Sequence, residues 1–139
     1  MSETIREVMT RDPATCSAED TAAEAAKAMR DGDFGAVVVL EGEEVRGILT
    51  DRDIVVRGVA EERDPKSIRV GEISTPNPAT LSPQDSVERA VEVLREAHVR
   101  RLPVVEGKEV VGIVSIGDLA EARDERSALA EISSAPPNN

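Results

Sequence analysis

Apolar residues follow a helical spacing in two separate stretches of the chain. In each stretch they stand at i, i+3, i+4 and i+7, the pattern of a helix with one buried face. They are Ala22, Ala25, Ala26 and Met29 in the first stretch, and Val87, Ala90, Val91 and Leu94 in the second. Ser17 and Asp20 are N-cap residue types, so the first helix is predicted to begin after them. It runs to about Arg30, and Gly32 ends it.

A short all-apolar run follows each predicted helix. Residues 36–40 are too short for an independent helix and rich in β-branched side chains, which predicts a strand. A turn at residues 41–43 returns the chain as a hairpin over residues 44–49, and a closing helix is predicted over residues 51–60. In the second run, Pro103 cannot donate a ladder hydrogen bond, which predicts an edge or a mouth at that end of the strand.

The two halves of the chain are copies of one another. Gly-Ile-Leu-Thr-Asp-Arg-Asp at residues 47–53 returns as Gly-Ile-Val-Ser-Ile-Gly-Asp at residues 112–118, an offset of 65 residues. The same offset relates residues 10–53 to residues 75–118 without a gap, which indicates duplication. We predict an α+β fold in which each repeat is strand, helix, strand, strand, helix.

The predicted organisation follows this duplication. The segments are repeat 1 over residues 5–60, a polar linker over 61–69, repeat 2 over 70–123, and a C-terminal helix and disordered tail over 124–139. A half-core of about 60 residues is marginal alone, so we expect the copies to pack on each other.

Composition narrows the possible functions. The net charge of −11 argues against binding to nucleic acid backbones or to a membrane through basic residues. Phe34 is the only aromatic residue, so the chain offers no platform for stacking single-stranded bases. The N-terminus is polar and no apolar run reaches the roughly 20 residues of a membrane span. We therefore expect a soluble cytoplasmic protein.

Catalytic and metal-binding residue types are scarce. Cys16 is the only cysteine and is expected to be a small buried apolar residue rather than a reactive thiol. His98 is the only histidine and is expected at the surface, at the end of a helix. No catalytic set is apparent, so we expect a protein that is not an enzyme and requires no metal or cofactor.

The repeated unit resembles a known family. Two copies of the motif Gly-h-h-[Ser/Thr]-x-x-Asp (h apolar), in register, are similar to a tandem pair of CBS domains, or Bateman module. Met-Thr-Arg-Asp-Pro at residues 9–13 and Arg-Arg-Leu-Pro-Val-Val at residues 100–105 are also similar. The resemblance covers about residues 5–123 and extends to stand-alone bacterial members. It implies two repeats packed through their sheets with pseudo-two-fold symmetry, clefts between them that bind adenosyl compounds, and homodimers formed by the repeat-terminal helices.

The end of the motif has two interpretations. Thr50 with Asp53, and Ser115 with Asp118, have the spacing of a capping box. A carboxylate at such a place can also accept both hydroxyls of a ribose, and the resemblance implies this second use. Both uses can coexist.

Other positions are assigned through the resemblance. It implies that Thr15–Cys16 and Thr80–Leu81 line an adenine pocket, where adenine lies between aliphatic residues and bonds to the backbone. It also implies that Arg100 and Arg101 meet phosphate, and the alternative is two solvated charges. The first copy has Gly35 and Ala36 there, and Arg52 corresponds to Gly117, so phosphate binding is expected to be unequal. Gly47 and Gly112 either let a backbone or a ligand approach or mark a bulge.

Together these features predict a regulatory protein that senses an adenine-containing ligand of the AMP, ATP, NAD or S-adenosylmethionine class, as in energy sensing. The alternative is a ligand-free dimeric scaffold or a docking protein for an unknown protein partner. The predicted ligand-binding residues are Thr15, Cys16, Gly47, Thr50, Arg52, Asp53, Thr80, Leu81, Arg100, Arg101, Pro103, Gly112, Ser115, Gly117 and Asp118.

Overall fold

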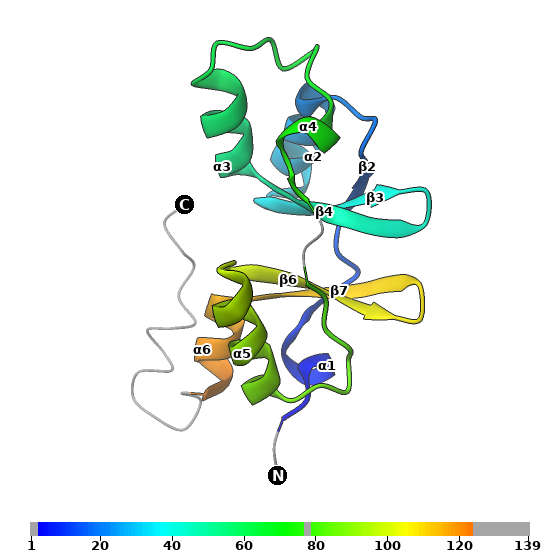
Figure 1. Cartoon of the computed structure of the whole chain (residues 1–139), viewed down its shortest axis with the longest axis vertical. Helices are drawn as coiled ribbons and strands as arrows, with labels where there is room; N and C mark the ends of the chain where they lie inside the picture. Colours follow the sequence, from blue (N-terminus) through cyan, green and yellow to red (C-terminus); the bar gives the residue numbers. More distant parts are fainter. Residues whose placement is uncertain (1–2, 77–78, 124–139) are drawn as a thin grey trace. The chain divides into compact units, whose positions relative to one another are not determined.

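The computed structural model describes residues 3–76 and 79–123, and these fall into two compact units (Figure 1). The first-repeat unit consists of residues 13–76, and the second-repeat unit combines residues 3–12 with residues 79–123. Each unit has its own sheet and its own helices. The mixed α and β architecture confirms the predicted fold class. The predicted C-terminal helix and tail lie outside the described residues.

The first-repeat unit contains a four-stranded sheet in the order β2-β3-β4-β5. Strand β2 is parallel to β3, whereas β3–β4 and β4–β5 are antiparallel pairs. The strands are β2 (Thr15–Ser17), β3 (Ala36–Glu41), β4 (Glu44–Thr50) and β5 (Thr75–Pro76). The helices are α2 (Ala22–Gly32), α3 (Asp51–Asp53), the π-helix η1 (Ile54–Val59) and α4 (Val70–Ile73). The helices cover one face of the sheet, and the core lies between them (Figure 1).

The second-repeat unit contains a three-stranded antiparallel sheet in the order β1-β7-β6. The strands are β1 (Thr10–Arg11), β6 (Arg101–Glu106) and β7 (Glu109–Ser115). The helices are α1 (Ile5–Val8), α5 (Val87–Ala97) and α6 (Ile116–Arg123). Here too the helices lie on one face of the sheet and enclose a separate apolar core (Figure 1).

The segment that precedes each repeat in the sequence completes the sheet of the other repeat. Strand β1 pairs with β7, and the amide of Ile5 donates to the carbonyl of Asp85 at 2.8 Å. Reciprocally, β5 pairs with β4, and the amide of Val70 donates to the carbonyl of Asp20 at 2.8 Å. The side chains of Ile5 and Val70 are fully buried. The units are therefore defined by packing and do not follow the order of the repeats along the chain.

The two amphipathic helices bury the predicted faces. Ala22, Ala25 and Met29 are buried in α2. The matching positions of α5, which are Val87, Ala90 and Leu94, are also buried. The duplicated stripe therefore forms the helix side of each core, as predicted.

Both ends of α2 differ from the prediction. Its N-cap is Thr21, whose hydroxyl accepts from the amide of Glu24 at 3.1 Å. Asp20 instead accepts from the amide of Ser17 at 2.9 Å and closes the preceding turn. The helix continues through Gly32 and ends at Asp33, which has a left-handed φ of 56°.

Gly32 does not end the helix, and its lack of a side chain is explained by packing. A Cβ atom at Gly32 would overlap the ring of Phe34, so glycine at this position leaves room for the ring. His98 is the equivalent of Asp33 and ends α5 with a φ of 55°, which confirms its predicted place at an exposed helix end.

The closing helices differ between the two units. In the first-repeat unit, the amide of Ala60 donates to the carbonyl of Val55 at 2.8 Å, an i to i−5 bond that defines the π-helix η1. In the second-repeat unit, α6 is an ordinary α-helix. The closing helix predicted over residues 51–60 is thus present as α3 followed by η1. In η1, Val55, Val56 and Val59 are exposed at 57%, 44% and 56%.

Candidate ligand-binding site

The repeated motif forms a hydrogen-bonded box where the last strand of each unit ends. Strand β4 buries Leu49 completely and then passes to Thr50. The amide of Thr50 donates to Asp53 Oδ2 at 2.9 Å, and the amide of Asp53 donates to Thr50 Oγ1 at 3.1 Å. Ser115 and Asp118 repeat these bonds at 2.9 and 3.2 Å after β7. The predicted capping box is therefore present in both units.

Each box uses only one of the two carboxylate oxygens. Asp53 and Asp118 each engage Oδ2 with the cap amide, and within residues 3–76 and 79–123 no hydrogen bond or ion pair engages Oδ1. Both residues are partly buried rather than covered. The box therefore orients the carboxylate and still leaves an acceptor for a ligand.

The predicted adenine segment lies at the same end of the sheet as the box. In the first-repeat unit Thr15 pairs with Val38, and Ala36 pairs with Thr50. Adjacent strands lie about 4.8 Å apart, so Thr15 and Thr50 are two strands apart at one sheet end. In the second-repeat unit Leu81 bridges to Val104, and Arg101 pairs with Ser115. In each unit the predicted adenine and ribose residues therefore flank the same strand, two residues apart in register in the first-repeat unit and three in the second.

Pro103 makes the adenine segment of the second-repeat unit different. In the first-repeat unit, the amide of Val38 donates to the carbonyl of Ala14 at 3.0 Å. Pro103 is the equivalent of Val38 and has no N–H, so within residues 79–123 the counterpart of β2 is reduced to the isolated bridge at Leu81. No donor among the described residues reaches the carbonyl of Ala79. Strand β6 is an edge strand, as the proline predicted.

Gly47 and Gly112 make room for a neighbouring strand. A Cβ atom at Gly47 would overlap the carbonyl of Thr75 in β5. At Gly112, it would overlap Met9 and lie 3.0 Å from the carbonyl of Thr10 in β1. A shift in strand register accompanies each glycine. Of the alternatives, close backbone approach beside a bulge explains both positions without a ligand.

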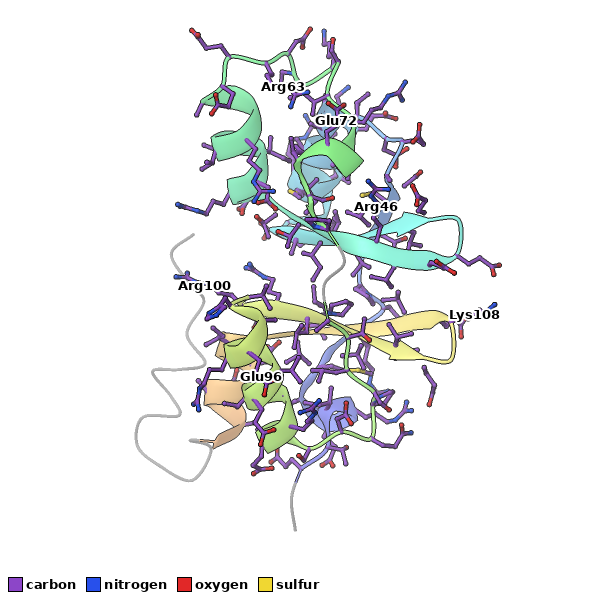
Figure 2. All side chains as sticks on the ribbon, in the orientation of Figure 1. Arg46, Arg63, Glu72, Glu96, Arg100 and Lys108 are labelled. Carbon is purple, nitrogen blue, oxygen red and sulfur yellow. The ribbon has the colours of Figure 1, made fainter. Side chains whose placement is uncertain are left out.

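The positions predicted to meet phosphate carry different residues in the two units. In the second-repeat unit, Arg100 is exposed where β6 begins (Figure 2), and its carbonyl accepts from the amide of Ile116 at 2.9 Å. In the first-repeat unit, the carbonyl of Gly35 accepts from the amide of Asp51 at 3.0 Å. The shared bond shows that Gly35 and Arg100 are equivalent positions.

Asp51 occupies the space that a side chain at position 35 would enter. A Cβ atom at Gly35 would lie 3.1 Å from Asp51 Oδ2, while Asp51 Oδ1 accepts from the amide of Arg52 at 2.8 Å. Sequence reasoning did not select Asp51. The signal was available, since the 65-residue offset sets Asp51 against the apolar Ile116. Arg52 is exposed beside it, and its equivalent Gly117 carries no charge.

Cys16 lies against the core of the first-repeat unit and is partly buried. Burial, and to a lesser extent the carboxylate of Asp20, raises the pKa of the Cys16 thiol from its ordinary 9.0 to about 11. The thiol is therefore protonated at neutral pH, and a protonated thiol is a poor nucleophile. This agrees with the predicted apolar role.

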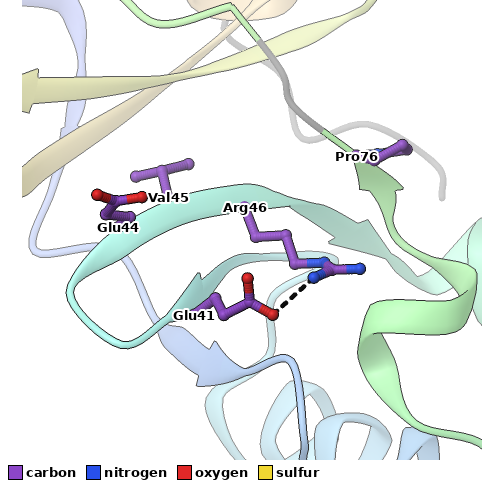
Figure 3. A pocket seen from close by; sticks show the side chains of 5 residues that line it. All are labelled: Glu41, Glu44, Val45, Arg46 and Pro76. Atoms are coloured by element: carbon purple, nitrogen blue, oxygen red, sulfur yellow. Dashed lines mark hydrogen bonds and ion pairs between the residues drawn. The ribbon is translucent and has the colours of Figure 1, made fainter.

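An open hollow of about 220 Å³ lies at the other end of β4, next to the hairpin turn (Figure 3). Arg46 crosses it and pairs with Glu41 at 2.7 Å, and Pro76 of β5 forms its far wall. Pockets for small molecules usually exceed roughly 300 Å³. We assign the hollow to the packing of Arg46 over the sheet rather than to a ligand.

Two kinds of feature are absent from the described part of the chain. None of its His, Cys, Asp and Glu side chains form a group of three or more that could hold a metal ion. None of its helices combines the length and apolar character needed to cross a bilayer.

Comparison with known proteins identifies the family. A family model described as the CBS domain matches the chain twice, over residues 5–59 and residues 70–125. The chain belongs to the CBS domain family. The CBS domain-containing protein YhcV of Bacillus subtilis is 38% identical over 116 residues, which is 84% of this chain and 82% of the relative. The tandem CBS pair inferred from the motifs is thereby confirmed.

Solved CBS structures share the fold. The hexameric CBS-CP12 protein from bloom-forming cyanobacteria superposes with a TM-score of 0.80 at 30% identity, covering 94% of this chain and 75% of that one. The CBS domain pair of protein MJ0100 was solved with 5′-methylthioadenosine and S-adenosylmethionine. It superposes with a TM-score of 0.79 at 22% identity, covering 91% of this chain and all of that one.

Proposed function

We propose that this CBS-domain chain is a regulatory module that binds an adenine-containing compound of the AMP, ATP, NAD or S-adenosylmethionine class. The proposal rests on the strand-end box found in both units, with one carboxylate oxygen of Asp53 and of Asp118 unengaged among the described residues. Two adjacent ribose hydroxyls are donors that such a carboxylate can accept. The adenosyl ligands of the MJ0100 domain pair support the same ligand class.

The proposed contacts divide the ligand into three parts. Adenine lies against the segments at Thr15–Cys16 and Thr80–Leu81, where exposed threonines flank partly buried and buried apolar residues. The ribose is held by the boxes. A phosphate is held mainly by Arg100 and Arg101, because guanidinium groups match phosphate oxygens and their charge. The chain acts by binding, without catalysis and without a required cofactor.

The exposed valines support a symmetric homodimer. Val55, Val56 and Val59 present an apolar surface on η1, which is the repeat-terminal helix of the first-repeat unit. Covering this surface with a second copy would remove it from water. The same observation favours the second candidate function, a dimeric scaffold that binds no nucleotide.

A thermal scan separates these two functions. A ligand at 100 times its dissociation constant stabilises the fold by about 2.7 kcal/mol. We expect at least one of AMP, ADP, ATP, NAD and S-adenosylmethionine at millimolar concentration to raise the Tm. If none does, and light scattering still shows a dimer rather than a 14.9 kDa monomer, the scaffold function is supported instead.

The role of the carboxylates needs a sharper test. Replacing Asp53 or Asp118 by alanine should weaken binding of a ribonucleoside by roughly 10- to 150-fold, the loss of a charge-assisted hydrogen bond. The 2′,3′-dideoxy analogue is the matched control, and its affinity should barely change. A variant that melts at a lower temperature but binds both nucleosides normally would show that the carboxylate only caps the helix.

A further inference from the structure

The equivalent positions 35 and 100 differ in more than the presence of an arginine. Position 100 carries a guanidinium beside the uncharged Ile116. Position 35 has no side chain, and the carboxylate of Asp51 fills the adjoining space, 3.1 Å from where a Cβ atom would be. The guanidinium of Arg100 therefore has no counterpart at position 35, and the carboxylate of Asp51, which is equivalent to Ile116, lies next to that position.

The charged residues of the repeated motif and of the positions predicted to meet phosphate reinforce this reversal. In residues 50–53 and 35–36 of the first-repeat unit these are the carboxylates of Asp51 and Asp53 and the guanidinium of Arg52. In residues 115–118 and 100–101 of the second-repeat unit they are the carboxylate of Asp118 and the guanidiniums of Arg100 and Arg101. Within the described residues, no salt bridge neutralises Asp51. The carboxylate of Asp51 accepts from the amide of Arg52, and this hydrogen bond leaves its negative charge in place.

We infer that Asp51 is a specificity-determining residue, and that the first-repeat unit takes an adenosyl compound with a cationic 5′ substituent while the second-repeat unit takes a 5′-phosphate. This inference rests on the proposed function and names the ligand class of each site. A phosphate beside the Asp51 carboxylate meets like charge, whereas a sulfonium or ammonium group gains an opposite charge. The ribose box is the same in both units, so the 5′ substituent decides which unit the ligand enters.

The sites can be separated by substituting one box at a time. The variant D118N leaves the first-repeat box intact, and D53N leaves the second-repeat box intact. Calorimetry on each full-length variant would compare AMP, the uncharged 5′-methylthioadenosine, and S-adenosylmethionine, which carries a sulfonium. In D118N we expect S-adenosylmethionine to bind tightest and AMP weakest. In D53N we expect AMP to bind tightest.

Adding D51N to D118N tests the residue itself. One charge at about 4 Å in water is worth about 1 kcal/mol, or about fivefold in affinity. D51N should therefore reduce the preference for S-adenosylmethionine over 5′-methylthioadenosine about fivefold and strengthen AMP binding by at least as much. Glu43→Gln removes a carboxylate from the distant hairpin turn of the same unit and should change neither ratio.

A pair exchange tests whether the reversal is sufficient. G35R/D51I installs the second-repeat pair in the first-repeat unit and should convert it to a phosphate-binding site. Native mass spectrometry of the unmodified chain with AMP and 5′-methylthioadenosine together should show one of each per chain, a measurement that needs no box variant. The exchanged chain should instead take two AMP molecules.

The outcomes distinguish this inference from the proposed function. If 5′-methylthioadenosine binds and D51N leaves all ratios unchanged, the assignment to Asp51 is wrong, although the chain still binds adenosyl compounds. If none of the three compounds binds the unmodified chain, the inference is overturned, and the proposed function falls with it if ADP, ATP and NAD also fail to bind.

Discussion

Val38 in the first-repeat unit and Pro103 in the second stand at the same position of the duplicated sheet, yet they produce different structures. Val38 donates to Ala14 and supports a parallel strand, whereas Pro103 donates nothing and leaves a single bridge. The helix after the box also differs, as a π-helix in one unit and an α-helix in the other. The boxes themselves are the same within 0.1 Å per hydrogen bond.

This contrast separates what folding needs from what can vary. The box ends a buried strand and begins a helix in both units, and its loss would leave helix amides without partners. The change from Gly35 to Arg100 adds an exposed side chain, and the change from the buried Val38 to the buried Pro103 removes one sheet hydrogen bond, yet the backbone plan stays intact. Duplication therefore preserved the framework and allowed the charge and hydrogen bonding of the two sheet ends to diverge.

The largest expected effect concerns the segment that precedes each repeat and completes the sheet of the other repeat. Ile5→Ala removes a fully buried side chain and should cost about 2–5 kcal/mol of unfolding free energy. Because Ile5 packs in the core of the second-repeat unit, hydrogen exchange should accelerate first in β6 and β7. Earlier exchange in β3 and β4, which follow Ile5 more closely in the sequence, would contradict the interleaved arrangement.

A smaller effect is expected from exchanging the residues at the equivalent positions 38 and 103. Val38→Pro should cost about 1–3 kcal/mol, since the carbonyl of Ala14 loses its donor. The reverse change, Pro103→Val, should gain less than this, because a more flexible unfolded chain offsets the new hydrogen bond to Ala79. Denaturant midpoints would measure both. Equal and opposite changes would contradict the offset from the unfolded chain, and an unchanged midpoint in Val38→Pro would show that the missing N–H does not separate the two units.

The smallest effect concerns the first turns of α2 and α5. Glu24 accepts from the amide of Thr21 at 3.0 Å, and this hydrogen bond lowers the pKa of the Glu24 carboxyl below its ordinary 4.5. The equivalent residue in α5 is Arg89, which cannot accept. Only the first-repeat unit therefore gains stability from an ionised residue at this position.

The sign of the pH effect follows from the lowered pKa. The stabilisation is complete above pH 4.5 and is lost as the pH falls from there through the lower folded-state pKa. Glu24→Gln should flatten the acid side of the Tm profile by no more than about 2 °C. Glu88→Gln, in the first turn of α5, serves as the comparison. An identical change in both variants would mean that general surface charge, not the cap, sets the acid limit.

The sequence alone determined the duplicated architecture, because its signals are local. The apolar stripes of α2 and α5, the boxes at Thr50 and Ser115, and the edge position of Pro103 each depend on residues a few positions apart. Their periodicity and hydrogen-bonding chemistry can be recognised without a fold. The resemblance to CBS domains followed from the same local motifs.

Only the tertiary structure decided which distant segments meet. The sequence could not show that β1 joins β7 and β5 joins β4, because strand pairing depends on edges that are far apart along the chain. That pairing alone explains why Gly47 and Gly112 carry no side chain. Contact between Gly35 and Asp51, 16 positions apart, likewise exists only once β3 and β4 have paired. The 65-residue offset could show that Asp51 stands where the other copy has Ile116, but only the folded structure places its carboxylate beside position 35.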